Sequence, residues 1–270
     1  MLVTGKGGVG KSTVASAIAL VAAQRGKKTL LVSMDGKEPV VATTANLDTL
    51  VFTTEEALRE YIALYVKIPF VSRLGLLAQT LDFVADAAPG VKEILAVGKV
   101  CHEARTGLHD VVVVDAESSG HFVSQVSTPR TIRSLAQVGM LREQTDWMIA
   151  MLSDPSVTAT VVVTTPEESP VDETIGLVSA IRERANVDVP AVVVNRMPAV
   201  APTSGDDIAP RVVSTLRRRH AIAAGEVGRL VGGLAAGTDV VVAPVLRTND
   251  AVETVVALAA SLDLEFGEAL

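Results

Sequence analysis

The chain has 270 residues, of which 49% are hydrophobic and 20% charged, and its formal net charge is −7. This length allows one α/β domain with a large core. The negative net charge argues against a basic field over the whole domain that would bind nucleic acid. A single cysteine, Cys101, excludes an internal disulfide, and no apolar run is long enough to predict a membrane span. We expect a cytoplasmic protein with no signal peptide and no stable membrane insertion.

A glycine-rich loop follows the first apolar residues. Residues 5–12, GKGGVGKS, fit the phosphate-binding pattern G-x-x-x-x-G-K-[ST] in full. Glycines allow backbone N–H groups to turn towards a polyphosphate, and the helix expected over residues 13–24 adds its positive N-terminus. Only four residues precede the loop, fewer than the five or six of a usual strand, so we expect a late start codon or missing residues. The predicted nucleotide contacts are Gly5, Lys6, Gly7, Gly8, Val9, Gly10, Lys11, Ser12 and Thr13.

Short valine-rich runs recur along the chain, with helical patterns between them. They predict strands at residues 29–34, 109–116, 159–165, 190–196 and 239–243. This alternation predicts an α/β fold of the P-loop NTPase type, with a mostly parallel central sheet flanked by helices on both faces. Because ligands bind beyond the carboxyl ends of parallel strands, the residues at those ends predict one shared site. They are Gly5, Asp35, Asp115, Pro166, Asn195 and Pro244.

A helical layer is expected beside this site. Residues 46–105 contain no comparable strand, and the segments 55–65, 76–88 and 91–104 have helical patterns. Together with residues 129–152 they predict a layer on one side of the nucleotide. We expect residues 1–270 to form a single domain.

Two residues are predicted to hold Mg²⁺. The Ser12 hydroxyl occupies the metal-binding position of the loop, and Lys11 supplies positive charge to the β and γ phosphates. Asp115 ends the apolar run Val111–Val114, as a Walker B aspartate does, and is expected to hold the metal through water. A carboxylate at the end of so apolar a strand is costly unless a cation or hydrogen bonds compensate its charge.

The second lysine of the loop gives the sequence its resemblance to a family. The form GKGGVGK[ST] is a deviant Walker A motif, and it resembles the SIMIBI-class ATPases that include ArsA/Get3, MinD, ParA and the nitrogenase iron protein. The resemblance implies that Lys6 crosses a dimer interface and stabilises charge on the partner's nucleotide. The alternative is that Lys6 is a solvated surface lysine.

Two further segments resemble the switches of the ArsA/Get3 group. Asp35 stands where that group has D-P-A, whose aspartate positions the attacking water, although Gly36 and Lys37 replace Pro and Ala here. The alternative role for Asp35 is capping a turn. Residues 115–121, DAESSGH, resemble D-T-A-P-T-G-H. The resemblance implies that the backbone N–H of Gly120 contacts the γ phosphate, and we expect His121 to be structural.

The resemblance also implies an adenine site. Asn195 follows Val192–Val194 as in the family's V-x-N segment, where the amide hydrogen-bonds the adenine edge; the alternative is a turn asparagine. Pro244, Val245 and Leu246 resemble the P-[LV]-L adenine loop. The run from Thr164 to Thr174 is similar to the T-x-P-E…ET stretch of bacterial ArsA-like ATPases.

Several family branches fit less well. One cysteine cannot build a trigonal thiolate site for a metalloid or a zinc site with two cysteines per subunit, and Cys101 is expected to pack in a helix. The cluster Arg217–Arg219 is expected to be a solvated helix face. One helical stripe favours a core-facing helix over a groove for apolar clients; it consists of Met140, Leu141, Trp147, Met148 and Met151.

The sequence resembles most the actinobacterial ArsA-like anion-transporting ATPases. This implies ATP/ADP and Mg²⁺ as ligands, a nucleotide-switched homodimer or a heterodimer with a paralogous ATPase, and a protein or membrane-protein client. The first alternative is a weakly catalytic or non-catalytic regulatory subunit of a heterodimer. The second is a ParA/MinD-like positioning ATPase, which the acidic composition disfavours.

Overall fold

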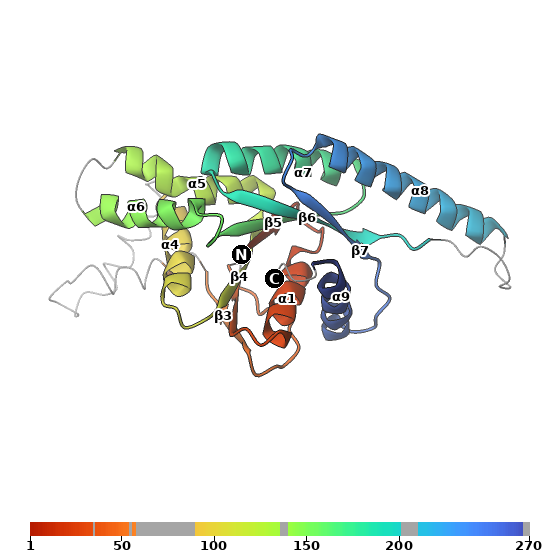
Figure 1. The fold of residues 1–270 in the computed structure, drawn as a ribbon, viewed down its shortest axis with the longest axis horizontal. Coiled ribbons are helices and arrows are strands. Elements are labelled where there is room, and N and C mark those ends of the chain that lie inside the picture. The colour runs from red at the N-terminus through yellow and green to blue at the C-terminus, as the bar shows by residue number, and fades with distance from the viewer. Residues whose placement is uncertain (35, 54–55, 58–89, 136–139, 201–209, 267–270) are drawn as a thin grey trace.

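A seven-stranded sheet forms the centre of the computed structural model, which describes residues 1–34, 36–53, 56–57, 90–135, 140–200 and 210–266 (Figure 1). The strands are β1 (Leu2–Gly5), β2 (Thr29–Ser33), β3 (Leu47–Val51), β4 (Val111–Ser118), β5 (Ala159–Thr164), β6 (Asp188–Met197) and β7 (Asp239–Pro244). Their order is β3-β2-β4-β1-β5-β6-β7, and all neighbours pair in parallel. This confirms the predicted α/β fold and the five valine-rich strands.

Helices cover both faces of the sheet. They are α1 (Lys11–Gln24), α4 (Val91–Arg105), α5 (Ser119–Leu135), α6 (Met140–Ser153), α7 (Glu168–Ala180), α8 (Pro210–Gly233) and α9 (Ala251–Phe266), with a π-helical turn η2 (Ile181–Ala185) after α7. α1 and α9 pack side by side on one face, and α5 to α8 lie over the other (Figure 1). Within the described residues, no helix is both long and apolar enough to cross a bilayer.

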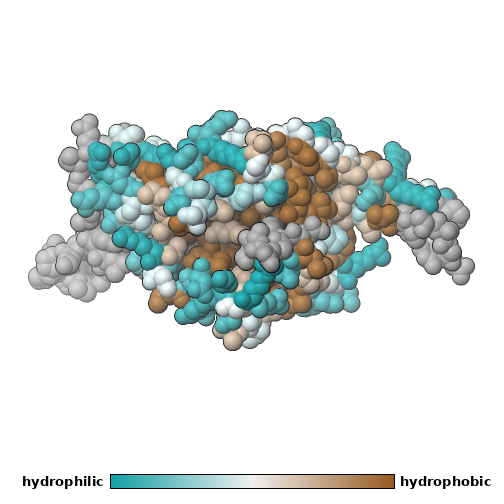
Figure 2. Space-filling view, viewed as in Figure 1, coloured by the Kyte–Doolittle hydropathy of each residue, from teal (hydrophilic) through white to brown (hydrophobic). Residues whose placement is uncertain are grey.

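Two hydrophobic cores result, one on each face of the sheet. Alternate residues of a strand point to opposite faces, so Val113 packs with α1 and α9, whereas Val112 and Val114 pack towards α4 and α5. These three side chains are at most 9% exposed. A strand buried on both sides has no polar alternation, which explains its continuous valine run. Apolar surface lies mainly over the middle of the face drawn in Figure 2.

Strand β3 corrects one expectation. Residues 46–105 were predicted to contain no strand, but Leu47–Val51 pair in parallel with β2 at the edge of the sheet. The sequence LDTLV is short and half polar because an edge strand keeps much of its surface in water, so it lacks the valine pattern of the central strands. The expected helix at 91–104 is confirmed as α4, whereas those at 55–65 and 76–88 lie outside the described residues, apart from 56–57.

Candidate functional site

The phosphate loop joins β1 to α1 at the carboxyl edge of the sheet. Two of its positions have no room for a side chain and therefore need glycine. Gly5 has φ 151°, and a Cβ there would lie 2.1 Å from the carbonyl oxygen of Val163 on β5. Gly10 has φ 96°, and a Cβ there would lie 2.4 Å from the Asn195 amide nitrogen. The loop therefore runs closely past β5 and β6, where side chains do not fit.

The N-terminus of α1 is suited to an anion. Gly10 occupies the N-cap position in the left-handed region, no side chain caps the first turn, and that turn contains no acidic residue. Lys11, Ser12 and Thr13 are the first three helical residues. Backbone N–H groups without side-chain acceptors and the positive end of the helix dipole together favour a phosphate at this position.

Two side chains from the end of β6 brace the loop. The Asn195 amide nitrogen donates a hydrogen bond to the Val9 carbonyl at 2.9 Å, and the Arg196 guanidinium donates to the Gly8 carbonyl at 3.1 Å. Asn195 is 7% exposed, and its Oδ1 accepts from the Arg196 backbone N–H. Arg196 has φ 61°, which is unusual for a residue other than glycine. The sequence indicated Asn195 but gave no signal for Arg196.

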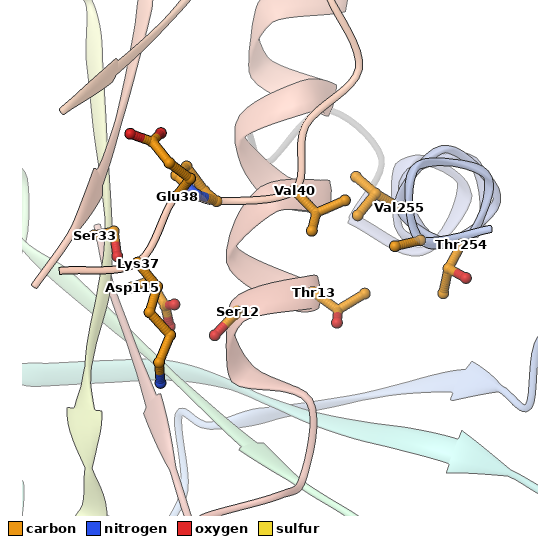
Figure 3. A pocket seen from close by; sticks show the side chains of 11 residues that line it. Ser12, Thr13, Ser33, Lys37, Glu38, Val40, Asp115, Thr254 and Val255 are labelled. Atoms are coloured by element: carbon orange, nitrogen blue, oxygen red, sulfur yellow. The ribbon is translucent and has the colours of Figure 1, made fainter. Parts of the chain in front are cut away.

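The predicted metal residues lie in one pocket of about 280 Å³, between α1, the segment after β2, and α9 (Figure 3). Ser12 and Asp115 both line it. Asp115 makes other interactions, but its Oδ1 is buried and accepts no hydrogen bond. A hydroxyl and a carboxylate oxygen at a phosphate loop are ligands that Mg²⁺ prefers, so these residues fit the ion.

Lys6 is held within its own chain. Its Nζ donates to the Ser169 hydroxyl at 2.7 Å and lies 3.2 Å from Glu173 Oε2, both residues being on α7. The Ser119 hydroxyl donates to the other oxygen of Glu173. This hydroxyl, together with the hydrogen bond and the charge of Lys6, lowers the pKa of Glu173 against the opposing effect of burial. One carboxylate thus connects the phosphate loop, α7 and the second-switch segment.

The second-switch segment ends β4 and starts α5. Gly120 stands in the first turn of α5, where a Cβ would meet nothing within 4 Å. His121 is 57% exposed, with its Nε2 3.7 Å from Glu93 Oε1 on α4. The predicted γ-phosphate contact of Gly120 stays a prediction.

The residues predicted to contact adenine lie on adjacent strands. Met197 and Pro244 are register partners, and the Val245 N–H donates to the Met197 carbonyl at 2.9 Å. Val245 is 46% exposed, whereas Leu246 packs against the core on the α1 side. The structure thus brings Asn195 and the segment 244–246 to the same end of the sheet, but their adenine contacts stay predictions.

Other sequence predictions have mixed outcomes. Asp35, the predicted water-positioning residue, lies outside the described residues. Trp147, Met148 and Met151 pack on the core, which confirms a core-facing α6 for these three side chains. Cys101 is buried on α4 as expected, and burial raises the pKa of its thiol to about 12. Arg217–Arg219 are exposed on α8, as predicted.

Comparison with known proteins gives consistent similarities. A family model described as "Anion-transporting ATPase" matches residues 1–145 and 133–223. The "ATPase BagA" of Mycobacterium tuberculosis is 30% identical over 221 residues, which cover 72% of this chain and 64% of the relative. A "Putative arsenical pump-driving ATPase" of Halobacterium salinarum is 27% identical, covering 71% of this chain and 34% of the relative. An "ATPase ASNA1 homolog" of Entamoeba dispar is 23% identical, covering 73% and 76% respectively.

Proposed function

Because this chain belongs to the ArsA-type family of anion-transporting ATPases, we propose that it binds ATP with Mg²⁺ and hydrolyses the terminal phosphoanhydride bond. The observation that carries the proposal is the uncapped N-terminus of α1 behind a complete phosphate loop, with Ser12 and Asp115 in one pocket beside it. The family is one of ATPases. The match spans 64% of the mycobacterial relatives' length, so the activity of this chain is our proposal.

The residues divide the chemistry among them. Lys11 and the loop N–H groups bind the β and γ phosphates, and Ser12 with Asp115 holds the metal, directly or through water. Bound Mg²⁺ neutralises charge that develops on the phosphate oxygens. Asp35 positions the attacking water, as the resemblance of its segment to the first switch implies. Asn195 and residues 244–246 hold the adenine at the end of β6 and β7.

We propose further that nucleotide closes a dimer, either of two such chains or of this chain with a paralogous ATPase. Lys6 then leaves Glu173 and contacts the partner's nucleotide. Its present ion pair lies at a half-exposed surface, where such pairs contribute roughly 0–1 kcal/mol, so a phosphate can displace the carboxylate. When the dimer reopens after hydrolysis, the helical layer predicted at residues 46–105 and 129–152 would transmit the motion to a protein or membrane-protein client.

Calorimetry with Mg²⁺ and a non-hydrolysable ATP analogue tests the proposal. Lys11→Ala should abolish binding, because the β and γ phosphates lose the positive charge of this lysine. The loop backbone is unchanged in this variant, so the loss would be due to the side chain alone. Lys27→Ala is the matched control, since Lys27 is an exposed lysine in the turn between α1 and β2, at the opposite end of α1. The wild-type chain should bind with measurable heat. Flat heats from folded wild-type protein would overturn the proposal.

A second candidate is a regulatory subunit that binds nucleotide beside an active paralogue. It is favoured by the Gly36-Lys37 replacement after Asp35 and by the Ser118-Ser119 pair, which departs from the D-T-A-P-T-G-H pattern of the second switch. Ser119 donates a hydrogen bond to Glu173. Turnover by the purified chain alone separates the two candidates. Robust activity alone removes the regulatory role, whereas activity that appears only with the paralogue supports it.

A further inference from the structure

We infer that Lys37 is a third phosphate-binding lysine, which enters the nucleotide site from the first-switch segment and contacts the terminal phosphate within its own chain. The inference rests on the proposed nucleotide binding and extends it. Neither the comparisons nor the resemblance of the loop assigns this residue a role, and the D-P-A pattern of the ArsA/Get3 group has alanine at this position.

The backbone after β2 places Lys37 at the pocket. Gly36 turns the chain with φ 74°, and a Cβ there would lie 2.8 Å from the Thr53 methyl carbon. The next residue, Lys37, lines the same pocket as Ser12 and Asp115. In Figure 3 its side chain runs past Asp115, and its ammonium nitrogen lies towards the end of α1 that carries Ser12. This is the end at which the phosphate loop meets the helix.

The charged side chains that line the pocket indicate what Lys37 could bind. Among the described residues that line it, Lys37 carries the one positive charge, and Glu38 and Asp115 carry the negative ones. Glu38 points away from the Lys37 ammonium in Figure 3, and Asp115 lines the same pocket as Lys37. A lysine is a compact point charge on a flexible stem and suits a phosphate oxygen. The Lys37 ammonium thus lines the pocket together with the two residues proposed to hold the metal, and we infer that it contacts the terminal phosphate there.

The position of Lys6 explains why a cation is needed here. Lys6 is paired with Glu173 and Ser169, and its proposed role begins only after a partner arrives. A chain that has not yet dimerised therefore lacks the second lysine of its loop as a phosphate ligand. Lys37 supplies this charge in cis, so the chain distinguishes triphosphate from diphosphate before it dimerises. The same contact would draw the segment after β2 onto the nucleotide.

The test compares the dissociation constants of a non-hydrolysable ATP analogue and of ADP, both with Mg²⁺, by calorimetry. Lys37→Ala should weaken analogue binding by about tenfold and leave ADP binding within about twofold, because ADP has no terminal phosphate to contact. Lys37→Arg should retain most of the preference for the analogue. Lys27→Ala is the control for general charge, and thermal unfolding checks that each exposed-site variant is folded.

Repeating the measurement in a Lys6→Ala background separates the contribution in cis from any contribution of a partner. The Lys37-dependent preference should persist there. If Lys37→Ala lowers the affinity for both nucleotides equally, or for neither, the inference is wrong. The proposed function would still stand in that case, provided that the wild-type chain binds nucleotide. A wild-type chain that binds neither nucleotide overturns both.

Discussion

Lys6 and Glu173 form an ion pair inside one chain, with Nζ 3.2 Å from Oε2 and the two side chains 37% and 38% exposed. Lys6, the first of the two lysines in the phosphate loop, is therefore paired with α7 within its own chain. If Lys6 acts on a partner's nucleotide, dimer closure must exchange one anion, a carboxylate, for another, a phosphate. Glu173 then opposes closure of the dimer, because its ion pair with Lys6 must break first.

Glu173→Gln should make nucleotide-dependent dimerisation easier. Lys6 loses its charged partner, so closure no longer has to break an ion pair, and the protein concentration at half-dimerisation should fall about twofold to fivefold. Sedimentation with Mg²⁺ and a non-hydrolysable ATP analogue measures it. Asp172→Asn is the matched control, because Asp172 is the adjacent acid on α7 and pairs with Arg229 instead. Unchanged dimerisation in Glu173→Gln would show that the ion pair does not restrain Lys6.

Lys6→Ala should bind nucleotide normally but hydrolyse it at least about a hundredfold more slowly, because charge on the transferring phosphate is no longer stabilised from the partner. Steady-state turnover and calorimetry measure the two effects separately. In a homodimer, mixing Lys6→Ala with Lys11→Ala chains should restore part of the activity, since each mixed dimer has one complete site. A mixture as inactive as its components would argue for a role of Lys6 in cis.

Gly5→Ala should destabilise the fold by roughly 1–3 kcal/mol, because the new Cβ would lie 2.1 Å from the Val163 carbonyl oxygen. Chemical denaturation measures the free energy of unfolding. Gly176→Ala in α7 is the control, since its Cβ would meet nothing within 4 Å and alanine favours helices. A Gly5→Ala chain as stable as Gly176→Ala would mean that β1 and β5 separate more easily than their parallel pairing indicates.

The sequence predicts those parts of the site whose physical requirements are local. Gly5 and Gly10 need backbone freedom within one loop, and Asp115 follows directly on the valines of a strand buried on both faces, so each leaves a contiguous pattern. Glu173 and Arg196 act on the loop from more than 160 residues away, and only the sheet order brings them there. Strand β3 was missed because its edge position removes the need for continuous apolar residues.

Ser119→Ala should raise the pKa of Glu173. The Ser119 hydroxyl is the largest single cause of its lowered value, and the hydrogen bond and the charge of Lys6 also lower it, so Ser119→Ala and Lys6→Ala should each raise this pKa. A carboxyl with a lowered pKa contributes stability above its ordinary value of 4.5, and this is lost as the pH falls through the lowered one. As the pH falls, Glu173 should therefore become protonated, and its ion pair with Lys6 should be lost, at a higher pH in Ser119→Ala than in the wild-type chain. Carboxyl ¹³C NMR titration measures each midpoint while circular dichroism monitors folding; a lower pKa in Ser119→Ala would contradict this account.

Asn195→Ala should weaken the binding of inorganic tripolyphosphate as well as of the ATP analogue. The amide donates to the Val9 carbonyl inside the loop and is only 7% exposed, so its loss leaves a loop carbonyl without this donor and loosens the phosphate site. Any contact with adenine adds a loss that only the analogue shows. Competition calorimetry with both ligands, in wild type and variant, gives the two contributions separately. Unchanged tripolyphosphate binding beside weaker analogue binding would assign Asn195 to the base alone and leave the bracing of the loop to Arg196.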